Sequence, residues 1–180
     1  MGRNDVDLVV LGALLGGPAH GYEVKKRITL AFASQYPNLS DSAIYPRLSF
    51  FEREGFVVSR VELQKGAPSR RIYQLTDSGV KRIKELAATP VKLPRSGIRN
   101  TEADMLSIHI VFFRFISEED RKKVIEPFYD FAKRRYEIAC RYMESYPREK
   151  LDEFVYPYLE YGIKVLKLSV DLYEKLVEIK

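Results

Sequence analysis

The residues best suited to chemistry are hydroxyl-bearing and basic side chains in the first half of the chain. Such groups donate hydrogen bonds, which suits them to phosphate oxygens and base edges. Small neighbours would let a ligand approach the backbone closely. We expect a binding surface at Ser40, Ser42, Ala43, Tyr45, Pro46, Arg47, Ser49, Lys65, Ser69, Arg70, Lys25 and Lys26.

The basic charge of the chain is confined to its first hundred residues. Residues 1–100 hold 16 Lys and Arg against 9 Asp and Glu, a net of +7, whereas residues 101–180 hold 14 against 16, a net of −2. A localised basic excess favours a polyanionic partner. Nucleic acid fits better than an acidic membrane surface, because the sequence has no basic amphipathic anchor helix.

Composition disfavours several other classes of protein. No apolar run approaches the roughly 20 residues of a membrane span, and Asp5 and Asp7 stand where a signal peptide carries positive charge. We therefore expect a cytoplasmic protein. With Cys140 as the only cysteine and His20 and His109 as the only histidines, we expect no internal disulfide, metal site or cofactor.

Two helices are expected before residue 33. The apolar segment 6–15 predicts a buried helix, capped by Asn4 or Asp5 and ended by the Gly-Gly-Pro sequence at 16–18. Residues 20–32 predict a second helix with one apolar stripe. That stripe consists of Tyr22, Val24, Ile28 and Phe32.

A third helix is expected to begin at Ser40 or Ser42, after the connection 34–39. If Ser40 is the cap, Leu39 and Ile44 have the spacing of a hydrophobic staple. A start at Ser42 would make Pro46 nearly harmless, because a proline early in a helix loses little hydrogen bonding. The buried stripe of this helix is predicted to be Ile44, Leu48 and Phe51.

The segments FVVSRVEL and RRIYQL, separated by the polar residues 64–69, predict a β-hairpin with a basic tip. Thr76 then caps a fourth helix. Two prolines and a glycine in residues 89–100 are typical of a linker. We therefore predict an N-terminal domain over 1–88, a linker over 89–100 and a helical region over 101–180.

The last 80 residues are expected to be helical. Ser117, followed by three acidic residues, predicts the start of a helix that runs to about Ser145 and is kinked or interrupted at Pro127. Pro147 separates it from a last amphipathic helix. The apolar face of that helix is wide, and we predict that it forms a dimer interface through Leu159, Ile163, Leu166, Val170, Tyr173 and Val177.

Three helices followed by a hairpin is the order of a winged helix-turn-helix. In such a domain the third helix enters the major groove of DNA and the hairpin, or wing, reaches an adjacent groove or phosphate track. The predicted fold is mainly α with a small β-hairpin: a winged helix-turn-helix domain followed by a C-terminal helical dimerisation region.

The chain resembles the PadR-like transcriptional regulators in three segments. These are GPAHGYEVKKRI at 17–28, SDSAIYPRLSFFEREGFV at 40–57 and GAPSRRIYQLTDSG at 66–79. The resemblance implies a homodimer, a palindromic operator and repression that a small phenolic or hydrophobic effector relieves. Family members that bind flat aromatic ligands often use a tryptophan near the dimer interface, and this chain, which lacks Trp, has Tyr173 at about that place.

Other readings of these residues remain. A winged helix can also serve protein assembly or bind DNA without sequence preference. No catalytic signature stands out in the sequence, and we therefore expect no enzyme. Tyr22, Tyr73 and Leu75 are expected to pack in the core or against the hairpin, His20 to be a capping or packing residue and Cys140 to be inert filler. The tyrosines of the C-terminal half could line an effector pocket, but packing is the commoner role.

Overall fold

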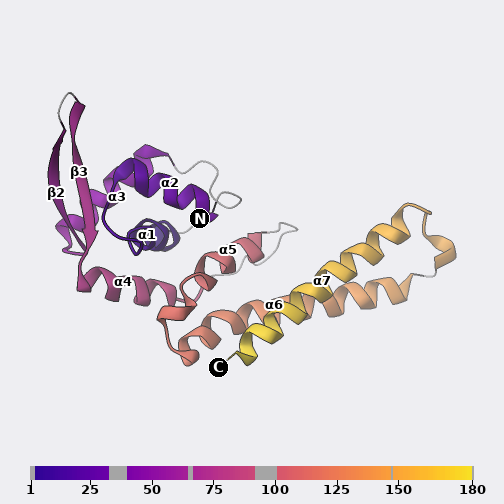
Figure 1. The fold of residues 1–180 in the computed structure, drawn as a ribbon. Coiled ribbons are helices and arrows are strands. Elements are labelled where there is room, and N and C mark those ends of the chain that lie inside the picture. Colours follow the sequence, from indigo (N-terminus) through magenta and orange to yellow (C-terminus); the bar gives the residue numbers. More distant parts are fainter. Residues whose placement is uncertain (1–2, 33–39, 65–66, 92–100, 147, 180) are drawn as a thin grey trace. The chain divides into compact units, whose positions relative to one another are not determined.

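The computed structural model describes residues 3–32, 40–64, 67–91, 101–146 and 148–179. It divides into two compact units, one of Met1–Thr89 with Ser107–Ile116 and the other of Pro90–Leu106 with Ser117–Lys180. The fold is mainly helical with a three-stranded antiparallel sheet (Figure 1). The domain limits predicted from the sequence remain a prediction, and most of the expected linker lies outside the described residues.

The N-terminal unit begins with α1 (Arg3–Gly12), β1 (Ala19–His20), α2 (Gly21–Phe32) and α3 (Asp41–Arg53). Helix α1 is buried on several sides, because Leu8, Val9, Val10 and Leu11 are all at most 1% exposed. The predicted caps of α1 are wrong, since the helix starts at Arg3 and Asn4 and Asp5 lie inside it. It also ends at Gly12 rather than Leu15. A Cβ on Gly12 would lie 2.3 Å from the Phe112 ring, so glycine is needed for this contact.

Helix α3 has the predicted buried stripe, with Ile44, Leu48 and Phe51 at most 1% exposed. Ser40 is its N-cap residue by position, although its side chain makes no capping hydrogen bond. The staple partner Leu39 lies outside the described residues. Pro46 is the sixth residue of the helix and is exposed. Because a proline has no backbone N–H, the carbonyl oxygen one turn earlier in the helix receives no hydrogen bond from it. That carbonyl lies on the solvent side of the helix.

The sheet has the strand order β1-β3-β2, with β2 at Val57–Gln64 and β3 at Ala67–Leu75. The predicted hairpin is confirmed by the antiparallel pairing of Val57 with Leu75 through to Glu62 with Arg70. Strand β1 was not predicted from the sequence. Ala19 and His20 pair with Tyr73 and Ile72, so this strand exists only through a partner about fifty residues away in the chain.

Helix α4 (Asp77–Ala87) starts where predicted, because the Thr76 hydroxyl accepts a hydrogen bond from the Gly79 amide at 3.1 Å. The unit is completed by residues 107–116, which include the end of α5 (Thr101–Ile110) and the 3-10 turn η1 (Phe113–Phe115). His109 on α5 is buried, and its Nδ1 lies 3.0 Å from the carbonyl oxygen of Ala87. This hydrogen bond fastens α5 to the end of α4.

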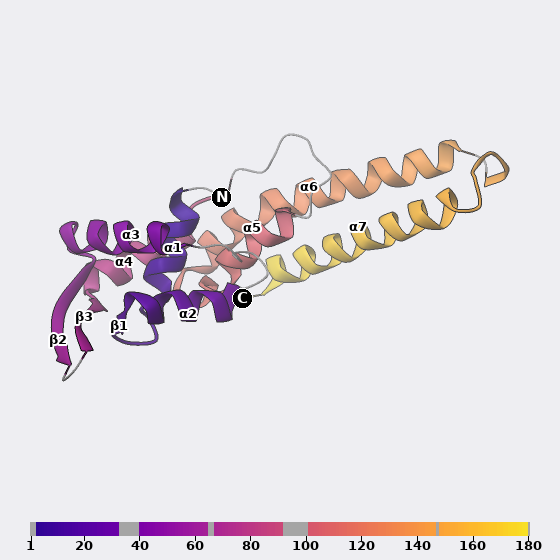
Figure 2. The ribbon, with the colours of Figure 1, turned by 90° about the horizontal axis from the view of Figure 1, so that it is seen from above.

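The C-terminal unit is dominated by an antiparallel pair, α6 (Glu118–Ser145) and α7 (Val155–Glu178), joined through the 3-10 turn η2 (Arg148–Lys150). The two helices lie side by side in both views (Figures 1 and 2). Ser117 caps α6 as predicted by accepting from the Asp120 amide at 3.1 Å. Of the predicted kink or interruption at Pro127, the interruption is wrong, since the helix continues through this residue, and the kink stays a prediction. Phe128 and Tyr173 pack with ring centres 6.1 Å apart.

Candidate nucleic-acid interface

The exposed side of α3 presents small and hydroxyl side chains. Ser42, Pro46 and Ser49 lie opposite the buried stripe, as the 3.6-residue period requires, and all three are exposed. Ser40 precedes them, and its hydroxyl lies 2.7 Å from that of Ser42. Ala43 is half-buried beside them. A helix with so little side-chain bulk can approach the edges of bases closely.

Tyr45, the bulky residue of this surface, is held against the start of α2. A Cβ on Gly21 would lie 2.3 Å from the Tyr45 ring and 2.9 Å from its hydroxyl oxygen. Only glycine therefore allows the tyrosine to lie here. The Tyr45 hydroxyl therefore lies beside Gly21, the first residue of α2, and the N-terminus of a helix favours anions through the helix dipole.

A hollow of about 470 Å³ lies where α2, α3 and β3 meet. It is lined by His20, Gly21, Tyr22, Tyr45, Ser69, Arg70, Arg71 and Tyr73. Ser69 and Arg70 are exposed on β3. Burial raises the pKa of Tyr73, although the adjacent Arg71 lowers it, so this phenol stays protonated at neutral pH. The hollow combines hydrogen-bond donors with a cation and has the chemistry of a phosphate site.

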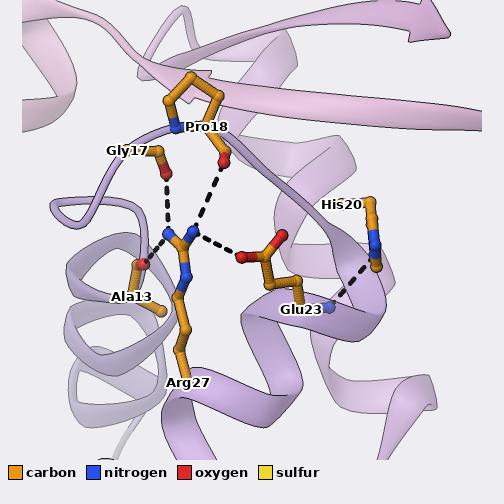
Figure 3. A network of polar contacts seen from close by, with 6 residues as sticks. All are labelled: Ala13, Gly17, Pro18, His20, Glu23 and Arg27. Atoms are coloured by element: carbon orange, nitrogen blue, oxygen red, sulfur yellow. Dashed lines mark hydrogen bonds and ion pairs between the residues drawn. The ribbon is translucent and has the colours of Figure 1, made fainter.

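The loop before α2 is fixed by Arg27 (Figure 3). Its guanidinium donates to the carbonyl oxygens of Ala13 at 3.0 Å and Gly17 at 2.8 Å, and it bonds Glu23 at 2.8 Å. His20 Nδ1 accepts from the Glu23 amide at 3.2 Å, which confirms the predicted capping role of His20. This network holds the first turn of α2 at the edge of the hollow.

The side chains of the other expected binding residues differ in whether they are exposed or already paired with a carboxylate. Arg47 turns inward, with its Nε 3.1 Å from Oδ1 of the buried Asp7. Lys25 pairs with Asp41 at 2.9 Å, Lys26 is exposed, and Lys65 lies outside the described residues. The structure therefore brings Ser69, Arg70 and Tyr45 together and separates Arg47 from them.

Sequence reasoning missed two residues that line the hollow and two exposed arginines on α3 and β2. Tyr22, predicted to pack in the core or against the hairpin, is 69% exposed, because Val24 and Ile28 already fill the buried side of α2 and Tyr22 lies off that side. Arg71 lines the hollow and pairs with Glu52 at 3.5 Å. Arg53 and Arg60 are exposed on α3 and β2. Only their charge could have indicated them, since nothing in the local pattern says which face they occupy.

Among the described residues, no group of three His, Cys, Asp or Glu side chains converges as metal ligands do. In the same part of the chain, no helix combines the length and apolar character that crossing a membrane requires.

Comparison with known proteins shows which family the sequence of this segment matches. The model of the transcriptional regulator PadR-like family matches residues 10–85, which confirms the resemblance over the segment that carries the surface. No curated protein matches.

Similar solved structures include Bacillus subtilis PadR in complex with operator DNA, at 20% identity over 95% of this chain and 96% of that one, with a TM-score of 0.46. Another is the PadR-like regulator BC1756 from Bacillus cereus, at 22% identity, 96% coverage of each chain and a TM-score of 0.38. A transcriptional regulator from Clostridium thermocellum is 26% identical over 46% of this chain and 77% of that one, with a TM-score of 0.42.

We expect Arg70→Ala to weaken binding to a random DNA duplex of about 30 base pairs and to reduce the slope of log K against log salt by about 1. The reason is that one phosphate contact and its released counterion are lost. Fluorescence anisotropy over a salt series measures both quantities. Lys81→Ala is the matched control, since Lys81 is exposed on α4. An equal effect of the two variants would contradict a phosphate site in the hollow.

Proposed function

We propose that this chain, whose residues 10–85 belong to the PadR-like family of transcriptional regulators, is a sequence-specific repressor that binds a palindromic operator as a homodimer. The observation that carries the proposal is the convergence of the α2 N-terminus, Tyr45 and Arg70 around one hollow beside the exposed side of α3. Phosphate contacts in the hollow would set the register of α3 in the major groove, and its small polar side chains would read base edges.

Two copies are needed because one helix reads too few base pairs to specify a genomic site. The six residues predicted to form the dimer interface differ in how deeply the structure buries them. Val170 and Tyr173 are already buried in the C-terminal unit, and the other four are half-buried. A second stripe on α7 is exposed and repeats at alternating spacings of three and four, as in a coiled coil. It consists of Tyr158, Tyr161, Val165, Leu168 and Leu172.

We propose that this exposed stripe, flanked by the half-buried residues of the predicted set, forms the dimer interface. Ile138 and Tyr142 on α6 and Tyr146 directly after it are exposed too, so both helices of the unit carry apolar surface. A contact between two copies of the α6 and α7 pair would remove this surface from water, which drives helix association.

The resemblance also implies a small aromatic or hydrophobic effector, and we propose that it binds in a second hollow of about 290 Å³ in the N-terminal unit. Phe112, Phe115 and Ile28 give this hollow apolar walls, and Arg114 lies at its edge, over the Phe115 ring at 4.6 Å. The Arg27 at this hollow already bonds backbone oxygens, whereas among the described residues no carboxylate pairs with Arg114. An aromatic carboxylate would suit these groups.

The alternative is a winged helix that serves protein assembly or binds DNA without sequence preference. A contact surface for proteins has no need of a hollow lined by arginine and tyrosine beside a helix with small polar side chains, which favours the first proposal.

Selection of bound duplexes from a random library, at low and at physiological salt, tests the function. We expect a palindrome whose half-sites lie about one helical turn apart. Recovery of salt-sensitive but sequence-blind binding would support the architectural alternative, and no binding to any duplex would exclude both DNA-binding functions.

A carboxylate placed in the exposed stripe should dissociate the dimer. We expect Leu168→Glu to raise the dimer dissociation constant at least about 100-fold, because burying an unpaired charge costs several kcal/mol. Sedimentation velocity at a series of concentrations measures this. Lys164→Glu adds a carboxylate to the polar side of α7 and should leave the dimer intact. A Leu168→Glu chain that remains dimeric would place the interface elsewhere.

Benzoate should stabilise the chain against thermal unfolding, by about 2.7 kcal/mol when its concentration is 100 times the dissociation constant, and should weaken binding to the selected duplex. Phenol, which lacks the carboxylate, should do less. Arg114→Ala should remove the difference between the two compounds, whereas Arg82→Ala, on α4, should preserve it. Equal responses in all three chains would contradict the proposed effector site.

A further inference from the structure

A buried ion pair connects α1 to the helix that reads DNA in the proposed function. Asp7 on α1 and Arg47 on α3 have side chains only 8% and 19% exposed, and Oδ1 of Asp7 lies 3.1 Å from Nε of Arg47. The Arg47 guanidinium also lies 5.9 Å from the centre of the Phe50 ring. Arg47 is therefore held from two sides within its own unit.

Apolar packing alone would hold α3 at lower cost. Ile44, Leu48 and Phe51 already bury one stripe of α3 in the core. Removing two charges from water is expensive, and a pair of apolar side chains of the same size avoids that cost. An ion pair has a property that apolar contact lacks, because its strength depends on the distance between two particular groups, whereas apolar attraction is spread over a surface. The pair therefore favours one rotation of α3 and one position of α3 along α1.

We propose that Asp7 and Arg47 are a positioning pair that sets the rotation and register of α3, so that Arg47 acts on sequence recognition through the helix and not through a phosphate. The inference rests on the proposed function and deepens it. It assigns Arg47, which the sequence placed among the DNA contacts, to the inside of the domain.

Arg53 provides the natural comparison. It lies on the same helix, and its guanidinium is 5.8 Å from the same Phe50 ring, yet it is exposed and, within the described part of the chain, has no carboxylate partner. The two arginines differ in burial and in the presence of Asp7. An effect that is specific to Arg47 therefore reports its buried pairing and not the charge of the helix or the aromatic contact.

The test uses Asp7→Asn, Arg47→Met, the double variant and Arg53→Met in the full-length chain. Thermal unfolding gives the coupling. We expect Asp7→Asn to lower the unfolding temperature strongly in the wild-type chain and in Arg53→Met, but little in Arg47→Met, where no buried cation loses its partner. Additive effects of Asp7→Asn and Arg47→Met would overturn the pairing itself.

Binding to the selected palindrome and to a random duplex distinguishes positioning from mere stability. In the double variant, at a temperature where it is fully folded, we expect the preference for the palindrome to fall at least tenfold. The salt slope on the random duplex should equal that of the wild type. Wild-type preference in the folded double variant would show that the pair only stabilises the fold, and a slope reduced by about 1 would show that Arg47 contacts a phosphate.

These outcomes are separable from failure of the proposed function. A wild-type chain that selects no sequence contradicts sequence-specific regulation before any variant is compared. A wild type that selects a palindrome, together with a double variant that retains the preference, contradicts only the positioning pair.

Discussion

Burial of α1 is the constraint on which the N-terminal unit depends. Four consecutive residues, Leu8 to Leu11, are almost completely buried, so neighbouring elements must cover the helix on more than one side. Helices α2, α3 and α4 all contact it. Gly12 gives room to the ring of Phe112. The helix thus serves as the common reference against which α2, α3 and α4 are placed.

The polar contacts of α1 follow from the same burial. Asp7 faces Arg47, and Asp5 faces His109 on α5, where the nearest atoms are 3.9 Å apart. His109 also bonds the end of α4. Charged groups are rarely placed in a core unless they are paired. Helix α3 and the segment that returns from residue 107 each have one such contact with α1.

Sequence reasoning succeeded where structure is determined within a few residues and failed where it depends on distant partners. The stripe of α3, the wing pairing and the caps Thr76 and Ser117 follow from local periodicity and local hydrogen bonds. Strand β1 needs β3, and the inward turn of Arg47 needs Asp7, forty residues earlier. No local pattern contains that information. The exposure of Tyr22 was also missed, because an aromatic residue at nearly helical spacing resembles a core residue.

The charge count of the sequence overstates what the surface can offer to DNA. Of the basic residues near the hollow and α3, Lys25, Arg47 and Arg71 are paired with Asp41, Asp7 and Glu52. The exposed cations without a carboxylate partner within the described residues are Lys26, Arg53, Arg60 and Arg70. In the proposed function, fewer cations would release fewer counterions, so the non-specific affinity for DNA would be correspondingly modest. Directed contacts from Tyr45 and the serines of α3 would then supply more of the binding energy, and such contacts depend on exact placement. Because directed contacts need exact placement, close packing around α1 would matter more to this surface than additional positive charge.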